Sequence, residues 1–405
     1  MKRTRTAILS IISLGHLDTH WNTGAFGLLS PFIAAEFGLS YAHIGVMSSV
    51  RFFISACVNL PGSALVDVLG KRTGSLMLAL AVPSLGYLLL SLAPSIGIIM
   101  IAMGLLGFGA SLWHPPAMSL LSSLMPDRRG FAMSTHEFGA GLGDLLSPLV
   151  FGLVLTFLSW RAAAALNILP GLLLALLVWF TISDRLGDSG PGKRLNLAEY
   201  RMALKKLIKH PVMLWLSAVS SLRTTAQQAI ITLLPLYLAK EWHLSPKMIG
   251  VYLGSASIAS LFAGPMMGAL SDRIGRMTIM LTAFIISGLC SLLLVALGQG
   301  LAFLITLFFL GMFLFSVRPI IFAAALDATP EETGASVVGL IFSANQLLAA
   351  ITPIFAGFLA DRYGGVALFY FAGISLLLGA VSALFVIKPI ALRPALPATA
   401  AEKPL

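Results

Sequence analysis

Ionisable and amide side chains interrupt an apolar stretch near the start of the chain. The segment 15–24, GHLDTHWNTG, carries His16, Asp18, His20 and Asn22 between apolar runs. A charged side chain near the bilayer centre costs about 3 kcal/mol on insertion scales, so such residues usually face a water-filled cavity. His16 and His20 share one helix face, and Asp18 and Asn22 share a face about 160° away. We expect Asp18 and Asn22 to line a cavity, and for the two histidines either helix packing or a functional role.

Three arginine residues lie inside apolar runs. Arg51 lies in VRFFISACVNL, Arg223 in SLRTTAQQ and Arg318 in FLFSVRPII. A guanidinium group suits carboxylate and phosphate ligands. We therefore expect all three to bind substrate, with outward reach to the membrane surface as an alternative for Arg51.

Carboxylate groups inside the apolar runs are candidates for carrying protons. Glu137 and Asp144 lie seven residues apart, close to one helix face. A carboxylate in a low-dielectric environment can bind a proton at physiological pH. We expect Asp18, Asp144 and Glu137 to couple function to protons, and an ion pair with Arg128 or Arg129 is the alternative for Glu137.

Amide, aromatic and imidazole side chains complete the candidate substrate site. They are Trp113, His114, Gln227, Asn345 and Gln346. Amide groups can hydrogen-bond a solute in a cavity. A nucleotide-binding loop, a metal-ligand cluster and a nucleophile constellation are not recognisable, so we expect no enzyme activity, no cofactor and no metal.

The composition indicates the elements that must position these residues. Of the 405 residues, 58% are hydrophobic and 10% are charged, whereas a soluble domain carries about 25% charged residues. Apolar segments of about 17–25 residues can cross a bilayer as helices. We expect an all-α membrane protein with twelve transmembrane helices near residues 8–34, 43–66, 74–93, 96–123, 131–158, 162–182, 212–239, 248–270, 277–297, 300–326, 335–359 and 365–388.

The distribution of polar residues divides the chain into four parts. The only long polar stretch separates the sixth and seventh expected spans, and its second half, LNLAEYRMALKKLIKH, has the spacing of an amphipathic surface helix. We expect an N-terminal six-helix bundle at 1–183, a cytoplasmic linker at 184–211, a C-terminal six-helix bundle at 212–390 and a tail at 391–405.

The net charge of +10 reflects membrane topology. Nineteen Lys and Arg residues fall on the side of the two termini and the linker, whereas the opposite side carries Arg161, Lys240, Lys247 and Arg362. Cytoplasmic loops carry the excess of basic residues. Both termini are therefore expected in the cytoplasm, in an inner (plasma) membrane, with membrane lipid and not nucleic acid as a partner.

The two halves of the chain are related by an internal repeat. The segments 36–46 (EFGLSYAHIGV) and 241–251 (EWHLSPKMIGV) match at an offset of 205, and the same offset relates SPLVFG at 147–152 to TPIFAG at 352–357. Two repeats of six spans each imply a pseudo-two-fold axis along the membrane normal, with a site at the midplane.

The repeat also pairs polar residues of the first and seventh spans. Asp18 corresponds to Arg223, and Asn22 corresponds to Gln227. We expect Asp18 and Arg223 to be coupled electrostatically across a cavity, and a fixed structural pair is the alternative.

Two loop sequences carry a family resemblance. SALVDVLGKR and GALSDRIGRM resemble the signature that follows the second span of each half in the major facilitator superfamily. A carboxylate at a helix end can pair with basic residues or a helix N-terminus. The resemblance implies a major facilitator fold, monomeric in that family, with gating residues at Asp67, Lys71, Arg72, Asp272, Arg273 and Arg276.

Within that family the chain is similar to the fosmidomycin-resistance group of exporters. The similar segments are GHLDTHWNTGAFGLLSPFIAAEFGLSYAHIG, GFGASLWHPPAMS and RRGFAMSTHEFGAGLGDLLSPL. The chain departs from that group where Pro116 replaces its usual Glu and where His20 follows Asp18 and Thr19 in place of an Asn-Asp pair.

The resemblance and the polar residues together predict a secondary transporter that works by alternating access. We expect proton-coupled export of a small organic anion, zwitterion or drug. One alternative is an importer or exchanger of organic anions that uses Arg223 and Arg318 as a clamp, and another is a receptor or membrane enzyme on the same scaffold.

Overall fold

A computed structural model describes residues 2–69, 72–182, 211–328 and 334–391. In the first half the helices are α1 (Lys2–Phe37), α2 (Tyr41–Leu69), α3 (Arg72–Ser91), α4 (Ile96–Leu124), the 3₁₀ turn η1 (Pro126–Arg128), α5 (Arg129–Phe157), α6 (Trp160–Leu166) and α7 (Ile168–Thr181). In the second half they are α10 (Pro211–Lys240), α11 (Pro246–Ile274), α12 (Arg276–Ala296), α13 (Leu301–Asp327), α14 (Gly334–Tyr363) and α15 (Ala367–Ala391).

The described residues confirm the all-helical fold class. Ten helical segments are long and apolar enough to cross a membrane. The other two long helices, α1 and α10, are those that carry the polar stretches GHLDTHWNTG and SLRTTAQQ. The number of twelve spans stays a prediction, and the expected linker helix lies outside the described residues.

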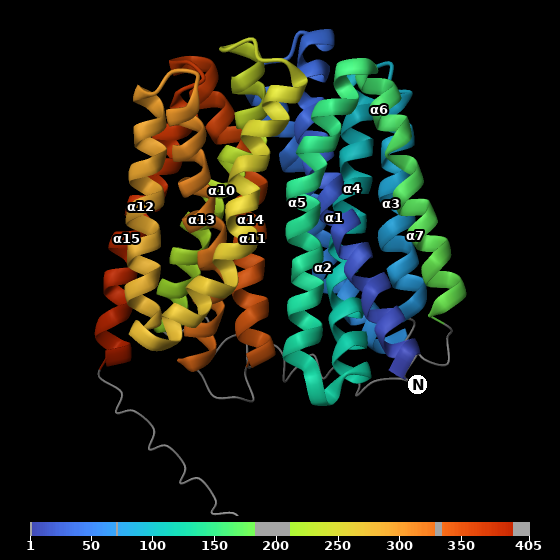
Figure 1. Ribbon diagram of the computed structural model, residues 1–405, viewed down its shortest axis with the longest axis vertical. Helices are drawn as coiled ribbons and strands as arrows, with labels where there is room; N and C mark the ends of the chain where they lie inside the picture. The colour runs from blue at the N-terminus through green and yellow to red at the C-terminus, as the bar shows by residue number, and fades with distance from the viewer. Residues whose placement is uncertain (1, 70–71, 183–210, 329–333, 392–405) are drawn as a thin grey trace, which may run out of the picture.

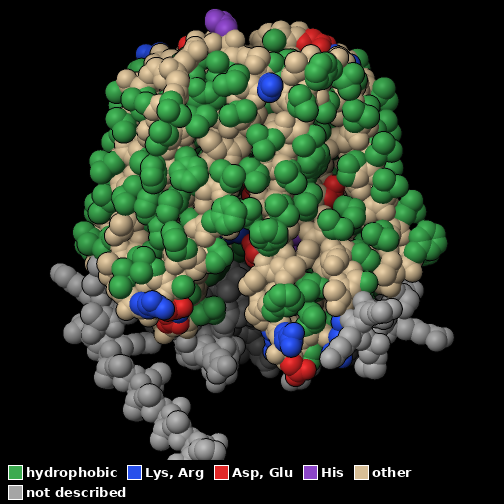
Figure 2. Space-filling model, viewed as in Figure 1, with side chains coloured by type: hydrophobic (Ala, Val, Ile, Leu, Met, Phe, Trp, Pro, Cys, Tyr) green, Lys and Arg blue, Asp and Glu red, His purple; other side chains and the backbone are tan. Residues whose placement is uncertain are grey.

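The helices form two bundles that stand side by side (Figure 1). In the first, α1 packs on α5, and α4 packs on α2 and α3. In the second, α10 and α12 pack on α15, and α11 packs on α13. The bundles meet where α2 packs on α14 and α5 packs on α11. Exposed leucine and phenylalanine side chains cover the outer surface, as expected for a surface in contact with lipid (Figure 2).

The two bundles come closest to each other at the upper end of Figure 1. The contacts there, between α2 and α14 and between α5 and α11, are related by the sequence repeat. A β-carbon added at Gly45 would lie 2.1 Å from the carbonyl oxygen of Pro353, and one added at Gly250 would lie 2.3 Å from that of Pro148. Both the glycines and the prolines are 205 residues apart. Only glycine permits this backbone approach, so the repeat places matching contacts in both halves.

Polar contacts between the bundles also lie at this closed end. The carboxylate of Asp361, at the end of α14, accepts hydrogen bonds from the backbone N–H groups of Tyr41 and Ala42, both at 2.9 Å. The Tyr41 hydroxyl donates to Glu241 at 3.0 Å. A carboxylate at a helix N-terminus satisfies its free N–H groups and its dipole. The second bundle thus caps the first helix turn of α2.

Candidate functional site

At the opposite end the bundles separate around a hollow. Figure 2 shows this hollow between the two bundles, with acidic and basic side chains gathered at its head. Polar contacts within and between the bundles involve side chains of α1, α2, α4 and α5 of the first bundle and of α10, α13 and α14 of the second. The polar residues of the candidate site fall into two groups, those exposed between the bundles and those buried within one bundle.

An ion pair joins the bundles across the hollow. Arg318 of α13 donates through Nη2 to Oε2 of Glu137 on α5 at 3.3 Å. Their side chains are 42% and 52% exposed, respectively. The alternative expected for Glu137, a bond to Arg128 or Arg129, is not what the structure shows. An exposed pair is worth about 0–1 kcal/mol, so it can be exchanged for contacts with a charged solute at little cost.

A second acidic group lies on the same helix as Glu137. Asp144 Oδ1 lies 3.0 Å from Nδ1 of His20 on α1. The Asp144 side chain is 45% exposed and that of His20 is 23% exposed. His20 also shares a helix face with Gly27, beside Pro235 of α10. This face of α1 is the one turned toward the second bundle.

Next to these pairs lies a cluster of buried rings. His16 donates through Nδ1 to the backbone carbonyl of His136 at 2.8 Å. The two imidazole rings stack, with centroids 3.8 Å apart and 14° between their planes. Trp113 Nε1 donates to His136 Nε2 at 3.2 Å, and the His114 ring lies 5.0 Å from that of His16. His16 Nε2 is buried without a hydrogen-bond partner.

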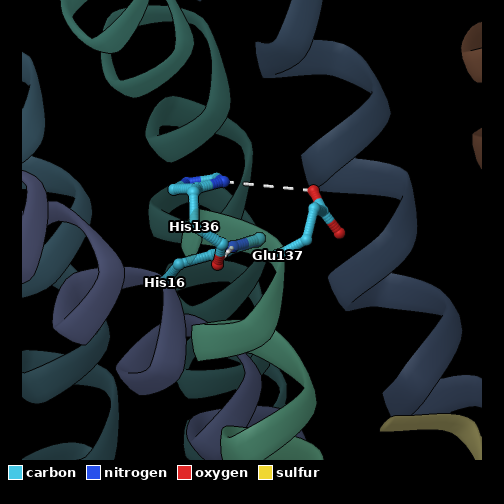
Figure 3. A group of neighbouring side chains, drawn as sticks. All are labelled: His16, His136 and Glu137. Atoms are coloured by element: carbon cyan, nitrogen blue, oxygen red, sulfur yellow. Dashed lines mark hydrogen bonds and ion pairs between the residues drawn. The ribbon is translucent and has the colours of Figure 1, made fainter. Parts of the chain in front are cut away.

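The ligand-type atoms of His16, His136 and Glu137 lie within 4.8 Å of one another (Figure 3). Their geometry does not fit a metal site. A ligating imidazole points its lone pair at the metal in the plane of the ring, and one ion cannot lie in both planes of two stacked rings. His136 Nε2 is also engaged by Trp113, which leaves the proton of a neutral ring on Nδ1. Packing and hydrogen bonding account for this cluster.

Asp18 is enclosed within the first bundle, whereas Asn22 also lines a small pocket. Asp18 is 3% exposed and accepts a hydrogen bond from Asn22 Nδ2 at 3.0 Å. Asn167 donates to Asn22 Oδ1 at 2.8 Å and accepts from Trp21 at 2.6 Å. Tyr87 donates to the Asn22 carbonyl. This network joins α1 to α3 and to the junction of α6 and α7, inside the first bundle.

The expected electrostatic pairing of Asp18 with Arg223 is absent among the described residues. Arg223 is 3% exposed and donates to Gln227 and, at 3.2 Å, to Thr224 on its own helix. The reason for the difference is helix rotation, because α1 turns its His20 face toward the second bundle and its Asp18 face toward α3 and α7. Arg223 bonds through Nη1 and Nη2 to its own helix α10, whereas its buried Nε has no hydrogen-bond partner among the described residues.

Several other expected residues occupy contacts between helices. Asn345 donates to Ser220 at 2.9 Å within the second bundle. Gln346 donates to Ser55 at 3.0 Å and so bridges α14 to α2 of the first bundle. Trp113 is fully buried. Of the amide residues expected to bind substrate, Gln346 therefore spans the two bundles.

The expected gating residues are described only in part. Arg276 forms ion pairs with Asp272, at 3.0 Å, and with Asp327 at the lower end of the second bundle. Arg72 begins α3, and Arg273 lies in the last turn of α11. Asp67 and Lys71 fall outside the residues whose side chains are described.

Sequence reasoning gave little weight to three features of the site. Spacing alone leaves His20 with packing as one of two roles, and it does not single out His136 or Asn167. An asparagine in the apolar run RAAAALNILPGLLLALL was a usable signal, because a buried amide needs hydrogen-bond partners. It marks the break between α6 and α7 and anchors the network around Asn22.

Comparisons with known proteins agree with this fold. The chain is 25% identical to the fosmidomycin resistance protein of Escherichia coli, over 68% of this chain and 67% of that one. It is 24% identical to a probable sulfoacetate transporter of Cupriavidus necator, over 95% and 94%. It is 26% identical to the multidrug resistance protein MdtG of Escherichia coli, over 85% and 86%.

Solved structures share the architecture. A bacterial homologue of the lysosomal transporter Spinster, in an inward-facing and occupied conformation, aligns with a TM-score of 0.76 at 15% identity, covering 98% of this chain and 100% of that one. A peptide transporter POT in complex with alafosfalin aligns with a TM-score of 0.76 at 16% identity, covering 95% and 94%. The family profile matches residues 12–237 and again residues 216–405. The chain belongs to the Major Facilitator Superfamily and is a multi-pass membrane transporter of small molecules.

Proposed function

We propose that this transporter exports small organic anions or zwitterions in exchange for protons, by alternating access. The observation that carries the proposal is the ion pair between Glu137 and Arg318, which joins the two bundles in the hollow. Relatives that match the chain include a fosmidomycin resistance protein and multidrug resistance proteins, which supports export as the direction.

The proposed conformation follows from the position of the closed contacts. The bundles touch at Gly45 and Gly250 and separate at the end where α1 begins. The excess of basic residues in the predicted loops favours cytoplasmic termini. We propose twelve spans in an inner membrane, with the two bundles at 1–183 and 212–390. The hollow then opens to the cytoplasm, where an exporter takes up its solute.

The exposed charges favour a zwitterion within the proposed class. Glu137 and Asp144 offer carboxylates to a cationic group, and Arg318 offers a guanidinium to an anionic group. A proton on either carboxylate removes its attraction for the cationic end of the solute. Proton and solute would then compete for the same groups, which is the condition for exchange.

Buried Asp18 is proposed as a further proton carrier. Its carboxyl group has Asn22 as its hydrogen-bond partner and forms no ion pair within the described residues. An unpaired charge there would carry a desolvation penalty of several kcal/mol. A carboxyl group in such a place can change its protonation as α1 moves against α3 and α7.

The alternative is import or exchange of organic anions with Arg318 as the clamp, supported by the same ion pair. An anion that displaces Glu137 from Arg318 frees a carboxylate to bind a proton, so proton and anion would move together. Arg223 contributes less to such a clamp in this conformation, because it is buried and bonded to Gln227 and Thr224.

The two functions differ in the direction of proton movement. Purified protein in proteoliposomes with an internal pH dye is exposed to aminomethylphosphonate, methylphosphonate or methylamine on one side. Exchange predicts that entry of the zwitterion makes the lumen more alkaline, whereas anion–proton symport predicts acidification with methylphosphonate. Glu137→Gln and Asp144→Asn should each abolish the response, and Lys247→Gln, an exposed residue at the closed end, serves as the charge control. Solute uptake with no pH change in the native protein would refute proton coupling.

A further inference from the structure

His20 and Asp144 form a partly exposed imidazole–carboxylate pair between α1 and α5. Nδ1 of His20 lies 3.0 Å from Oδ1 of Asp144. Water reaches both side chains, because neither is buried. Imidazole is the side chain that ordinarily changes charge between about pH 5 and 8. The pair therefore joins a ring of the type that binds protons near neutral pH to a carboxylate that can attract a solute.

Three other imidazole rings lie close to this pair, but their surroundings do not suit a proton carrier. His16 and His136 are each 1% exposed. His136 accepts a hydrogen bond from Trp113 on Nε2, which a second ring proton would break, and its Nδ1 lies 3.9 Å from Glu137. His114 forms no hydrogen bond or ion pair with the described residues. A charge on a buried ring without a close acid carries a desolvation cost.

Charged and titratable groups face the pair or its neighbours from the surrounding helices. They are His16 on α1, Arg51 on α2, His114 on α4, His136 and Glu137 on α5, Arg223 on α10 and Arg318 on α13. The three arginines bond to other partners, namely Glu137, Thr23 and side chains of α10. Arg51 attracts Asp144 electrostatically without forming an ion pair among the described residues. His20 is therefore the group that directly holds Asp144.

The charge of His20 controls what Asp144 can bind. A protonated ring neutralises the carboxylate and holds it by a charge-assisted hydrogen bond. A neutral ring leaves a half-exposed negative charge that can attract an ammonium group. The proton reaches the ring from water on one side of the membrane and returns to water on the other side. The cycle therefore needs no reactant besides the proton and the solute.

We propose that His20 carries the exchanged proton and that its charge decides whether Asp144 binds the cationic end of the solute. The inference rests on the proposed exchange, and it assigns the proton to a ring in addition to the carboxylates. A proton on His20 and a solute at Asp144 weaken each other's binding, and this effect is reciprocal. On the more acidic side a proton releases the solute, and on the other side the solute releases the proton.

Nitrogen NMR of the full-length protein, labelled at the histidine rings, tests the titration without any solute. The His20 signals are identified by their loss in His20→Asn. We expect this ring to change reversibly between neutral and charged within about pH 5–8, whereas His16 and His136 stay neutral. A His20 ring that keeps one charge over the whole range would overturn the proposal.

A second variant tests the role of the carboxylate even if His20→Asn does not fold. Asp144→Asn removes a negative charge 3.0 Å from Nδ1 and should weaken proton binding at His20 about tenfold. Asp127→Asn, which removes an exposed acid in η1, is the matched control and should leave the titration unchanged. A titration that ignores Asp144→Asn would overturn the pairing.

Transport in proteoliposomes separates this inference from the proposed exchange. His20→Asn still offers an amide donor to Asp144 but binds no proton near neutral pH. We expect this variant to admit aminomethylphosphonate, because Asp144 keeps its charge, and to lose the rise in lumen pH. Full alkalinisation by His20→Asn would overturn the role of His20 and leave the exchange standing. Solute entry without alkalinisation by the native protein would refute the exchange itself.

Discussion

Replacing Gly45 or Gly250 with alanine should open the closed end of the transporter. The added β-carbon would lie 2.1 Å from the Pro353 carbonyl oxygen or 2.3 Å from that of Pro148. Ordinary contact begins at 3.4 Å, so the helices must separate by about 1.3 or 1.1 Å in the closed state. Overpacking of this kind costs about 1–3 kcal/mol, which corresponds to an about 5- to 150-fold change in the ratio of the two conformations.

The opening is measured as the distance between spin labels at His43 of α2 and Lys247 of α11, two exposed residues at that end. Pulsed electron paramagnetic resonance gives the distribution of this distance. The labels require a background in which Cys57 and Cys290 are replaced by serine. We expect both alanine variants to populate longer distances than the native sequence. Gly264→Ala is the matched control, since nothing lies within 4 Å of its added carbon. Native distance distributions in both test variants would refute the close helix contacts.

Three further predictions concern other contacts. Glu36 lies past the expected membrane span of α1, and the hydrogen bond from Arg161 holds its pKa below the usual range. The charged carboxylate therefore stabilises the folded protein above the pKa of the unfolded chain, and this stabilisation is lost as the pH falls. Glu36→Gln should accordingly flatten the decline of Tm below about pH 4.5. Asp18→Asn should change Tm little. Asp18→Ala leaves the Asn22 amide without its acceptor and should lower the free energy of unfolding by about 1–3 kcal/mol. Equal Tm values for the two variants would contradict this prediction. Asp361→Ala removes the cap of α2, worth about 0.5–2 kcal/mol, and should lengthen the same spin-label distances, whereas unchanged distances would count against the cap.

The repeat made the fold predictable from the sequence. A constant offset of 205 relates Gly45 to Gly250 and Pro148 to Pro353, and the structure places these four residues in two equivalent contacts. Hydropathy alone identifies fewer of the long helices as membrane spans, because the polar stretches of α1 and α10 lower the apolar content of these two helices. The two long helices that hydropathy misses are thus the ones that carry the polar stretches GHLDTHWNTG and SLRTTAQQ.

The sequence predicts which polar residues lie inside the bundles, but it does not predict which of them contact one another. Helical spacing correctly separated the face of Asp18 from the face of His20, but it cannot tell which face meets the second bundle. That choice depends on packing partners such as Gly27 against Pro235 and on the polar network around Asn167, which the spacing of residues along one helix does not encode. The contact of Glu137 with Arg318 is hidden for the same reason.

Proton movement driven by solute in proteoliposomes tests the central claim most directly. The account predicts that aminomethylphosphonate entering through the native protein makes the lumen more alkaline, and that Glu137→Gln abolishes this response while the Lys247→Gln control keeps it. Solute entry without a pH change, or an undiminished response in Glu137→Gln, would contradict proton exchange at the ion pair between the bundles.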